Sequence, residues 1–379
     1  MRFFEFRHVN KTPLTEGARI DHVEDLIFWQ ASVGAVKALN SLVELEKGGH
    51  KDVTVKWDGS PAIIFGRDED GKFILTDKSG FGAVKYNGRA KSPRELEKML
   101  MARPGASNPD PKKADEYRQF AGNMKDIFDE YEKAVPKDFR GYFKGDLLYY
   151  NTPPIKDGEF VFTPNIVTYF VDQNSELGQQ ISRSKTGIVV HRIINAEGTE
   201  GPVNIDLNNM MPGDDVVFFP SVTTSSAPQV NNSKVIELKT LINQNKNDID
   251  LLLSLDVLES KKMKYLRDVF YNYINQTNLK TDFVSWLKNK PDVNDTKRNK
   301  IMSHIGENQK GFDATWKIVA GLQELKNNII DQFDKQDTGV RAVTGNIPGG
   351  EGYVMAHPTG DIKLVNRAGF TAANRAVQR

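Results

Sequence analysis

Apolar residues recur at helical spacing from residue 21 to residue 47, in DHVEDLIFWQASVGAVKALNSLVELEK, and the pattern stops at Gly48-Gly49. This spacing predicts a helix that ends at a glycine stop. From Val53 to Thr76 the period changes to three short alternating runs, VTVKW, AIIFG and KFILT, with Asp70-Gly71 before the third. The alternation and the Asp-Gly pair predict an antiparallel sheet with a hairpin turn.

Helical spacing returns at residues 93–101 and 112–134. Five further strand-like runs follow, separated by Pro, Gly and Asn: GYFKGDLLYY, GEFVF, NIVTYFV, GIVVHRII and DVVFF. Helices mixed with antiparallel strands predict an α+β fold. Residues 1–220 are therefore expected to form the first part of an α+β core.

The pattern changes after residue 220. Residues 221–233 are polar and predict a linker, and residues 234–337 show helical periodicity, which predicts an inserted helical domain. Residues 338–379 contain EGYVMAHPTGDIKLV, which predicts a β-hairpin with its tip at Pro358–Gly360. The core is thus expected to resume after the insertion, as a C-terminal hairpin and tail.

Composition narrows the chemistry. The chain has no cysteine and six histidines, which excludes disulfides, thiolate metal sites and cysteine nucleophiles. Its 51 Lys and Arg against 50 Asp and Glu leave a net charge of +1, so any nucleic-acid surface has to be local. The longest apolar runs are far shorter than the roughly 20 residues of a membrane-spanning helix. We expect a cytoplasmic protein without membrane association.

Lys56 stands in a strand-like run, VTVKWDGSPAIIFG, where a charged residue is unusual. An inward-facing lysine must lose its proton or find an anion, because an unpaired buried ammonium is costly to desolvate. The alternative is a lysine on an edge strand that keeps its ammonium in water.

KWDGS resembles the nucleotidyl-lysine motif, Lys-x-Asp-Gly, of the covalent nucleotidyltransferases, which comprise polynucleotide ligases and mRNA capping enzymes. Four further stretches resemble this family's motifs in the same order: TDKSG, FKGDLLY, NIVTYFVD, and EGYVM followed by DIKLV. The chain departs from the family pattern at Asp146, where glutamate is usual, and at Val365, where a second lysine is usual. The serine that follows Gly59 resembles the motif of RNA ligases more than that of DNA ligases.

The resemblance implies roles for particular residues. Lys56 would take AMP from ATP, and Lys363 is the second catalytic residue. Gly59 would let the backbone approach the nucleotide, Asp58 would hold the loop or a sugar hydroxyl, and a ring of Tyr169 or Phe170 would stack on adenine. The other implied nucleotide contacts are Lys78, Asp146 and Arg367, the last compensating for Val365. Glu351 and Asp146 would bind Mg²⁺, with Mn²⁺ as an alternative metal.

The family also implies an architecture and a substrate. The fold would be the nucleotidyltransferase (ATP-grasp-like ligase) antiparallel-sheet core, here with an inserted helical domain, as in a divergent RNA-ligase-like protein of the sort large bacteriophages encode. A phage protein of this kind would work in the host cytoplasm. Its partners would be polynucleotide ends, with RNA favoured over DNA, since no C-terminal OB domain follows the core.

Two other functions stay open at this point. One is a GTP-using guanylyltransferase of the capping type, and the other is a non-catalytic nucleotide-binding or assembly protein on the same fold. SKTGIVVHRI also resembles the Glu-Gly-apolar strand, but Thr186 stands where the acid should be. A neutral hydroxyl cannot balance Mg²⁺ as a carboxylate does, so we assign Glu351 and Lys363 to the site.

Two basic stretches are candidates for polynucleotide contact. Lys78–Arg94 combines cations with Phe81, Tyr86 and glycines, which suits phosphate contact and base stacking. KKMKYLRDVFYNY, residues 261–273, has four cations ahead of several aromatics, but its helical spacing favours a solvated face over a bundle core.

Overall fold

The computed structural model describes residues 21–84, 91–195, 199–203, 207–211, 213–220, 224–336, 339–345, 347–355 and 361–367. It is a mixed α+β protein with several antiparallel sheets, as predicted. The chain forms two compact units. Of the described residues, the first unit comprises 59–153 and 179–219, and the second comprises 21–58, 154–178 and 220–367. This division cuts across the predicted segments, because parts of residues 21–220 belong to each of the two units.

The first unit is built on one sheet with the strand order β10-β9-β5-β3-β4, and β11 pairs with β9 in parallel. Its strands are β3 (Ala62–Arg67), β4 (Phe73–Asp77), β5 (Gly141–Tyr149), β9 (Thr186–Ile194), β10 (Glu200–Pro202) and β11 (Val216–Phe218). The helices beside them in the chain are α2 (Lys78–Val84), α3 (Pro93–Met101), α4 (Pro111–Asp126), α5 (Phe128–Ala134), α6 (Glu176–Arg183) and α7 (Leu207–Met210). The predicted Asp70-Gly71 hairpin is confirmed by the antiparallel pairing of β3 with β4.

Both faces of this sheet carry apolar side chains. One face packs Phe65 and Phe143 against Leu96 of α3 and Phe128 of α5. The other face carries a smaller cluster that includes Tyr142. Because successive strand residues point to opposite faces, the continuous apolar run of β3 places its side chains in both clusters.

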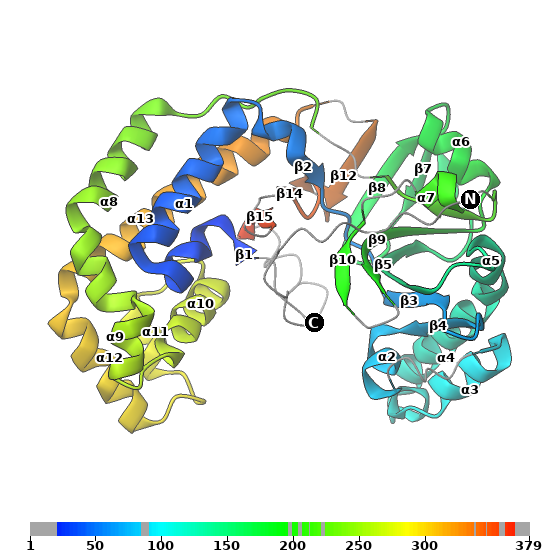
Figure 1. Cartoon of the computed structure of the whole chain (residues 1–379), viewed down its shortest axis with the longest axis horizontal. Helices are drawn as coiled ribbons and strands as arrows, with labels where there is room; N and C mark the ends of the chain where they lie inside the picture. Colours follow the sequence, from blue (N-terminus) through cyan, green and yellow to red (C-terminus); the bar gives the residue numbers. More distant parts are fainter. Residues whose placement is uncertain are drawn as a thin grey trace. The chain divides into compact units, whose positions relative to one another are not determined.

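The second unit contains a helical bundle (Figure 1). Its helices are α1 (Leu26–Glu46), α8 (Asn232–Leu253), α9 (Leu255–Ser260), α10 (Tyr265–Thr277), α11 (Phe283–Lys288), α12 (Asp295–Glu307) and α13 (Gln309–Phe333). A single hydrophobic cluster joins α1, α8, α10 and α13 to Tyr353 and Leu364 of the C-terminal hairpin. The predicted helical segment 234–337 therefore shares its core with the predicted N-terminal helix and with the hairpin.

Two small sheets complete the second unit. One has the order β1-β15-β14-β2 and the other β13-β12-β8-β7-β6. The strands are β1 (Asp21–His22), β2 (Val53–Val55), β6 (Ile155–Lys156), β7 (Glu159–Phe162), β8 (Val167–Asp172), β12 (Val340–Thr344), β13 (Ile347–Pro348), β14 (Tyr353–Met355) and β15 (Ile362–Leu364). The C-terminal hairpin is confirmed by the pairing of β14 with β15, and its predicted tip lies outside the described residues.

The pairing of β2 differs from the prediction. The sequence placed VTVKW in one sheet with the next two runs, whereas β2 pairs with β14, about 300 residues away in the chain. β3 and β4 belong to the other unit. The reason is that residues 56–61 are not in a strand, so the chain can leave one sheet after Val55 and enter another at Ala62.

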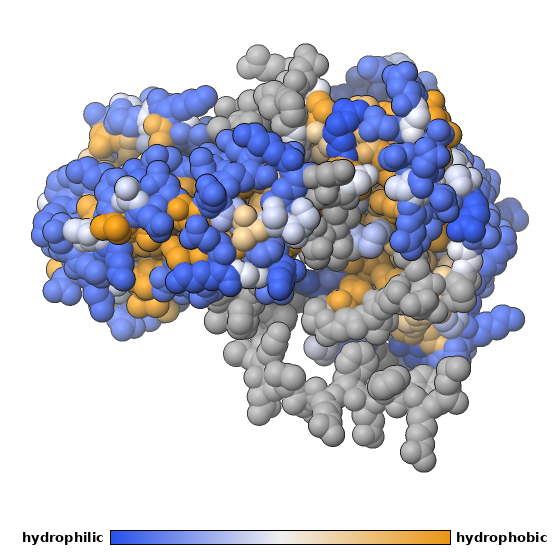
Figure 2. All heavy atoms as spheres, turned by 90° about the horizontal axis from the view of Figure 1, so that it is seen from above, coloured by the Kyte–Doolittle hydropathy of each residue, from blue (hydrophilic) through white to orange (hydrophobic). Residues whose placement is uncertain are grey.

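Within the described residues, Val23–Glu46 is the helical stretch long and apolar enough to cross a membrane by length and composition. In the protein, 61% of its most apolar window is buried. The stretch shares the hydrophobic core of the second unit with α8 and α13. The exposed large apolar residues of the second unit are Val33, Val36, Ile155, Ile236, Leu251 and Leu255, and Figure 2 shows apolar areas separated by hydrophilic surface.

Candidate functional site

Lys56 pairs with an anion from a distant part of the chain. Its ammonium forms an ion pair with the Glu351 carboxylate, 295 residues away in sequence. The Lys56 backbone N–H also donates to the Gly352 carbonyl at 2.9 Å. The two side chains are 21% and 12% exposed. The predicted nucleophile and the predicted metal-side acid therefore meet, because β2 and β14 are neighbours in one sheet.

Glu351 is surrounded by charge. Burial raises the pKa of its carboxyl above the usual value, and the positive charges of Lys56 and Lys363 oppose this rise. The nearby negative charge of Asp58 adds to the rise. Lys363 lies on β15, directly opposite Val354 of β14. Lys56, Asp58 and Lys363 therefore all lie close enough to act on the charge of Glu351.

Asp58 holds the loop through its own side chain. The carboxylate is buried and accepts hydrogen bonds from Asn165 Nδ2 at 3.0 Å and from the backbone N–H groups of Ile166 and Val167 at 3.0 and 3.2 Å. Both carboxylate oxygens are engaged by donors at the start of β8. Of the two predicted roles, holding the loop is the one these contacts perform. Sequence reasoning missed Asn165, which carries only the weak signal of an Asn beside a strand.

Tyr169 is tied to the same loop. Its ring is buried between Trp57 and Phe162, with centroid distances of 4.8 and 5.6 Å, and its hydroxyl accepts a hydrogen bond from the Asp58 N–H at 2.6 Å. Burial raises the pKa of the phenol, so the hydroxyl stays neutral. These contacts make Tyr169 a positioning residue for the segment that carries Lys56.

Phe170 points to the other face of β8, because adjacent strand residues alternate. Its ring is covered by the guanidinium of Arg341, 3.6 Å from the ring centroid, and Arg341 also pairs with Glu159 at 2.6 Å. Of the two rings predicted to stack on a base, Tyr169 contacts the Lys56 loop and Phe170 faces away from it.

Tyr169→Phe is expected to lower the free energy of unfolding by about 1–3 kcal/mol, because the Asp58 N–H would be left buried without an acceptor. Urea unfolding measures the change. Tyr265→Phe is the matched control, since the structure gives the half-buried Tyr265 hydroxyl no hydrogen bond, and it should change stability by less than about 0.5 kcal/mol. Equal stability of Tyr169→Phe and the wild type would show that the hydroxyl does not hold the loop.

Arg367 lies in a different cluster from Lys56. Its guanidinium donates to both carboxylate oxygens of Asp25 at 2.7 Å and lies 3.4 Å from Glu24. Burial raises the pKa of Asp25 to about 7 against the opposing charge of Arg367. Lys326 donates to Glu24 at 2.8 and 2.9 Å. The guanidinium of Arg367 is therefore paired with Asp25 inside the protein, and the nearby Val365 is buried in the core.

Gly59, Asp146 and Lys78 belong to the first unit. A Cβ at Gly59 would lie 2.7 Å from the Asp146 Cβ, so the approach that requires glycine is the one to β5. Asp146 Oδ2 lies 3.0 Å from His191 Nε2, a partner that the sequence did not indicate. Lys78 is exposed at the start of α2. Of the basic stretch after it, residues 85–90 lie outside the described residues.

The carboxylates present restrict how a metal could bind. No group of three or more His, Asp or Glu that could hold a metal ion occurs among the described residues. Glu351 in the second unit offers one carboxylate. Mg²⁺ commonly uses one or two carboxylates together with waters and substrate phosphates, so Glu351 fits a metal carried by a nucleotide.

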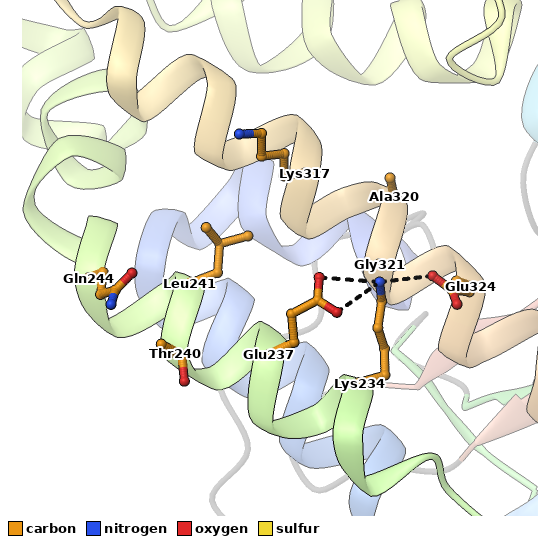
Figure 3. Close-up of a pocket in the computed structure, with 9 residues that line it drawn as sticks. All are labelled: Lys234, Glu237, Thr240, Leu241, Gln244, Lys317, Ala320, Gly321 and Glu324. Carbon is orange, nitrogen blue, oxygen red and sulfur yellow. Dashed lines mark hydrogen bonds and ion pairs between the residues drawn. The ribbon is translucent and has the colours of Figure 1, made fainter.

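A separate groove of about 590 Å³ lies between α8 and α13 (Figure 3). Lys234 is held there by Glu237 and Glu324 at 3.3 and 3.0 Å. At Gly321 a Cβ would lie 2.6 Å from Leu238, so the two helices need a glycine to pack this closely. The groove is a packing seam in which Lys234 is paired with two glutamates, and none of the predicted site residues lines it.

The fold and the site define a mixed α+β protein with a partly buried lysine–glutamate pair set in a hydrogen-bonded loop. The model of a family of unknown function (DUF6267) matches residues 18–90 and 110–379, and the chain belongs to that family. No curated protein and no solved structure matches the chain.

Proposed function

We propose that the chain is an ATP-dependent polynucleotide ligase that acts through a covalent lysyl-AMP at Lys56. The observation that carries the proposal is the ion pair of Lys56 with Glu351, which joins the first and fifth motif segments across 295 residues. The positive charge of Lys363 opposes the rise in the pKa of Glu351, which supports the proposal further, because a residue of the sixth motif segment then lies near the same carboxylate. The substrate class is polynucleotide ends, with RNA favoured.

The proposed first step is attack of the Lys56 amine on the α-phosphorus of ATP. A P–N bond forms, the α–β phosphoanhydride bond breaks, and pyrophosphate leaves with the bonding electrons. An ammonium has to lose its proton before it can attack, and the Glu351 carboxylate in contact with Nζ is placed to receive that proton. Mg²⁺, when bound, would offset phosphate charge beside Glu351.

Two later steps complete the proposed reaction. A 5′-phosphate oxygen attacks the AMP phosphorus, so the P–N bond breaks and the lysine amine is regenerated. A 3′-hydroxyl then attacks the activated 5′-phosphate, forms the phosphodiester and releases AMP. Asp58 and Tyr169 would hold the Lys56 loop throughout. The nucleotide contacts predicted for Asp146, Lys78 and Phe170 stay predictions.

Incubation with Mg²⁺ and each α-labelled nucleoside triphosphate, followed by a denaturing gel, tests this function. We expect a labelled band with ATP. A band with GTP alone would favour the capping-type guanylyltransferase. A folded chain that binds ATP and takes up no label with any nucleotide would favour a non-catalytic nucleotide-binding or assembly protein.

Glu351→Ala and Lys363→Ala are each expected to slow Lys56 labelling roughly a hundredfold or more, on the order of 3 kcal/mol of transition-state stabilisation. Single-turnover labelling measures the rates. Arg341→Ala, on the exposed face of the β8 sheet, and His191→Ala, in the first unit, should label at nearly the wild-type rate. Slow labelling by His191→Ala together with normal labelling by Glu351→Ala would reverse the assignment.

A further inference from the structure

Positive charge is concentrated in one part of the second unit. Between residues 261 and 310 the chain has eleven Lys and Arg and five Asp and Glu, which gives a net charge of +6 with histidine neutral. Since the whole chain has a net charge of +1, the rest of it has a net charge of −5. The concentration falls on α10, α11, α12 and the loops beside them, which lie together in the bundle (Figure 1).

The fold brings two lysine-rich segments of this region side by side. Lys261 contacts His304 Nδ1 at 3.2 Å and Glu307 at 2.7 Å, so the loop before α10 lies against α12. Lys297 at the start of α12 lies 5.4 Å from the centre of the Tyr265 ring at the start of α10. The sequence separates these segments by some thirty residues, and the contacts of Lys261 and Tyr265 with α12 join them.

We call the exposed lysines of this surface the basic patch: Lys262, Lys264, Lys297 and Lys300. Lys264 is compensated by Glu259 at 2.8 Å. For Lys262, Lys297 and Lys300, no carboxylate oxygen among the described residues is recorded within salt-bridge distance, 4.0 Å. Three cations therefore face solvent without a local counter-charge, which is the arrangement that a partner rich in phosphate would neutralise.

The patch has one half-buried aromatic ring, Tyr265, which lies under Lys297, and among the described residues it lacks an exposed apolar centre. Protein interfaces usually have an apolar or aromatic centre. Of the exposed large apolar residues among the described positions, none falls between residues 261 and 310. The observations therefore favour a nucleic-acid backbone over an acidic protein.

The length of α13 relates the patch to Lys56. The helix begins at Gln309, directly after α12, and ends at Phe333, whose ring packs 5.1 Å from Tyr353, two residues after Glu351. Twenty-five helical residues span roughly 37 Å at 1.5 Å each. A stacked strand rises about 3.4 Å of helix axis per nucleotide, so this length corresponds to roughly eleven stacked nucleotides.

We infer that the basic patch binds the phosphate backbone of a polynucleotide about eleven nucleotides from the end that Lys56 acts on. The inference rests on the proposed function for the position of that end. It predicts that a long strand contacts both the patch and the Lys56 loop, whereas a short stacked strand held at Lys56 ends before the patch.

The test uses the full chain with Lys56→Ala, so that binding is measured without chemistry. The probes are 5′-phosphorylated RNAs of about 20 and about 6 nucleotides with a dye at the 3′ end, and anisotropy gives the affinity over a series of salt concentrations. The patch variant adds Lys262→Gln, Lys297→Gln and Lys300→Gln. The matched control adds Lys239→Gln, Lys246→Gln and Lys317→Gln, three exposed lysines on α8 and α13 that remove the same charge.

We expect the patch variant to lose about tenfold or more in affinity for the long RNA, and its salt slope to fall by about 2, since each phosphate contact contributes about 0.7 for a single strand. Affinity for the short RNA and the behaviour of the control should change less than about twofold. Equal losses in the patch variant and the control, equal losses for both RNA lengths, or no binding of RNA by the Lys56→Ala chain would overturn the inference.

The two proposals can fail separately. A chain that takes no label from any nucleotide but binds long RNA through the patch would remove the ligase function and keep the binding surface. A chain that labels with ATP while the patch variant binds long RNA like the parent would keep the function and remove the surface. Thermal melting of each variant confirms that the fold is intact.

Discussion

Lys56→Ala is expected to abolish covalent labelling by α-labelled ATP, because the variant lacks the proposed attacking amine. Among the described residues, Lys56 is the one whose amine forms an ion pair with Glu351. Lys56→Arg sharpens the test. Arginine can keep the ion pair with Glu351, but its guanidinium stays protonated and cannot attack phosphorus. We therefore expect Lys56→Arg to fold like the wild type and to take up no label, as judged by a denaturing gel and by urea unfolding.

Lys51→Ala is the matched control, because Lys51 is an exposed lysine five residues before Lys56, and it should label normally. The chemistry of the bond gives a second check. A phosphoramidate should survive alkali and be lost in acid. An acid-stable label, or equal labelling of Lys56→Ala, would show that Lys56 is not the nucleophile.

Lys326→Met is expected to lower the free energy of unfolding by about 3–5 kcal/mol. Lys326 and Glu24 are both fully buried, and the ammonium contacts both carboxylate oxygens of Glu24. Methionine keeps the volume but removes the cation, so Glu24 would stay buried with Arg367 as its remaining cationic neighbour. Urea unfolding at pH 7 measures the loss.

The effect should depend on pH in a definite direction. Burial alone would raise the pKa of Glu24, but Lys326 and Arg367 lower it to about 2 in the folded protein. A carboxyl with a lowered pKa adds stability above its unfolded pKa, about 4.3, and this stability is lost as the pH falls toward 2. The difference in free energy of unfolding between the wild type and Lys326→Met should therefore be largest at neutral pH and should become smaller below about pH 4.

Two further variants isolate the cause. Lys317→Met, at an exposed position on the same helix, should change stability by less than about 0.5 kcal/mol. Glu24→Gln combined with Lys326→Met should recover part of the loss, because no unpaired buried carboxylate remains at position 24. A double variant as unstable as Lys326→Met would mean that packing, and not the buried charge, causes the loss.

Much of the local structure follows from the sequence. The helix at 93–101, the helical character of residues 234–337 and the strands in GYFKGDLLYY and GIVVHRII agree with their periods, because periodicity depends on neighbours a few residues apart. The same holds for the hairpin that carries Lys363, whose two runs are separated by turn residues. Lys56 stood out in the sequence as a charge in an apolar run, and Glu351 was selected through the resemblance of EGYVM to a family motif.

The tertiary structure decided which of these elements meet. Hydrophobic spacing predicts that one face of an element is buried, but it does not identify the element that covers this face. The pairing of β2 with β14 and the packing of α1 in the helical core therefore had no local signal in the sequence. The sequence showed Asp58 and Tyr169 as candidate ligand contacts, whereas the fold gives their polar groups to each other and to β8. Arg367 was likewise available to any anion in sequence. Only the packing of the chain places Asp25 beside it, because a buried guanidinium has to be paired where it lies.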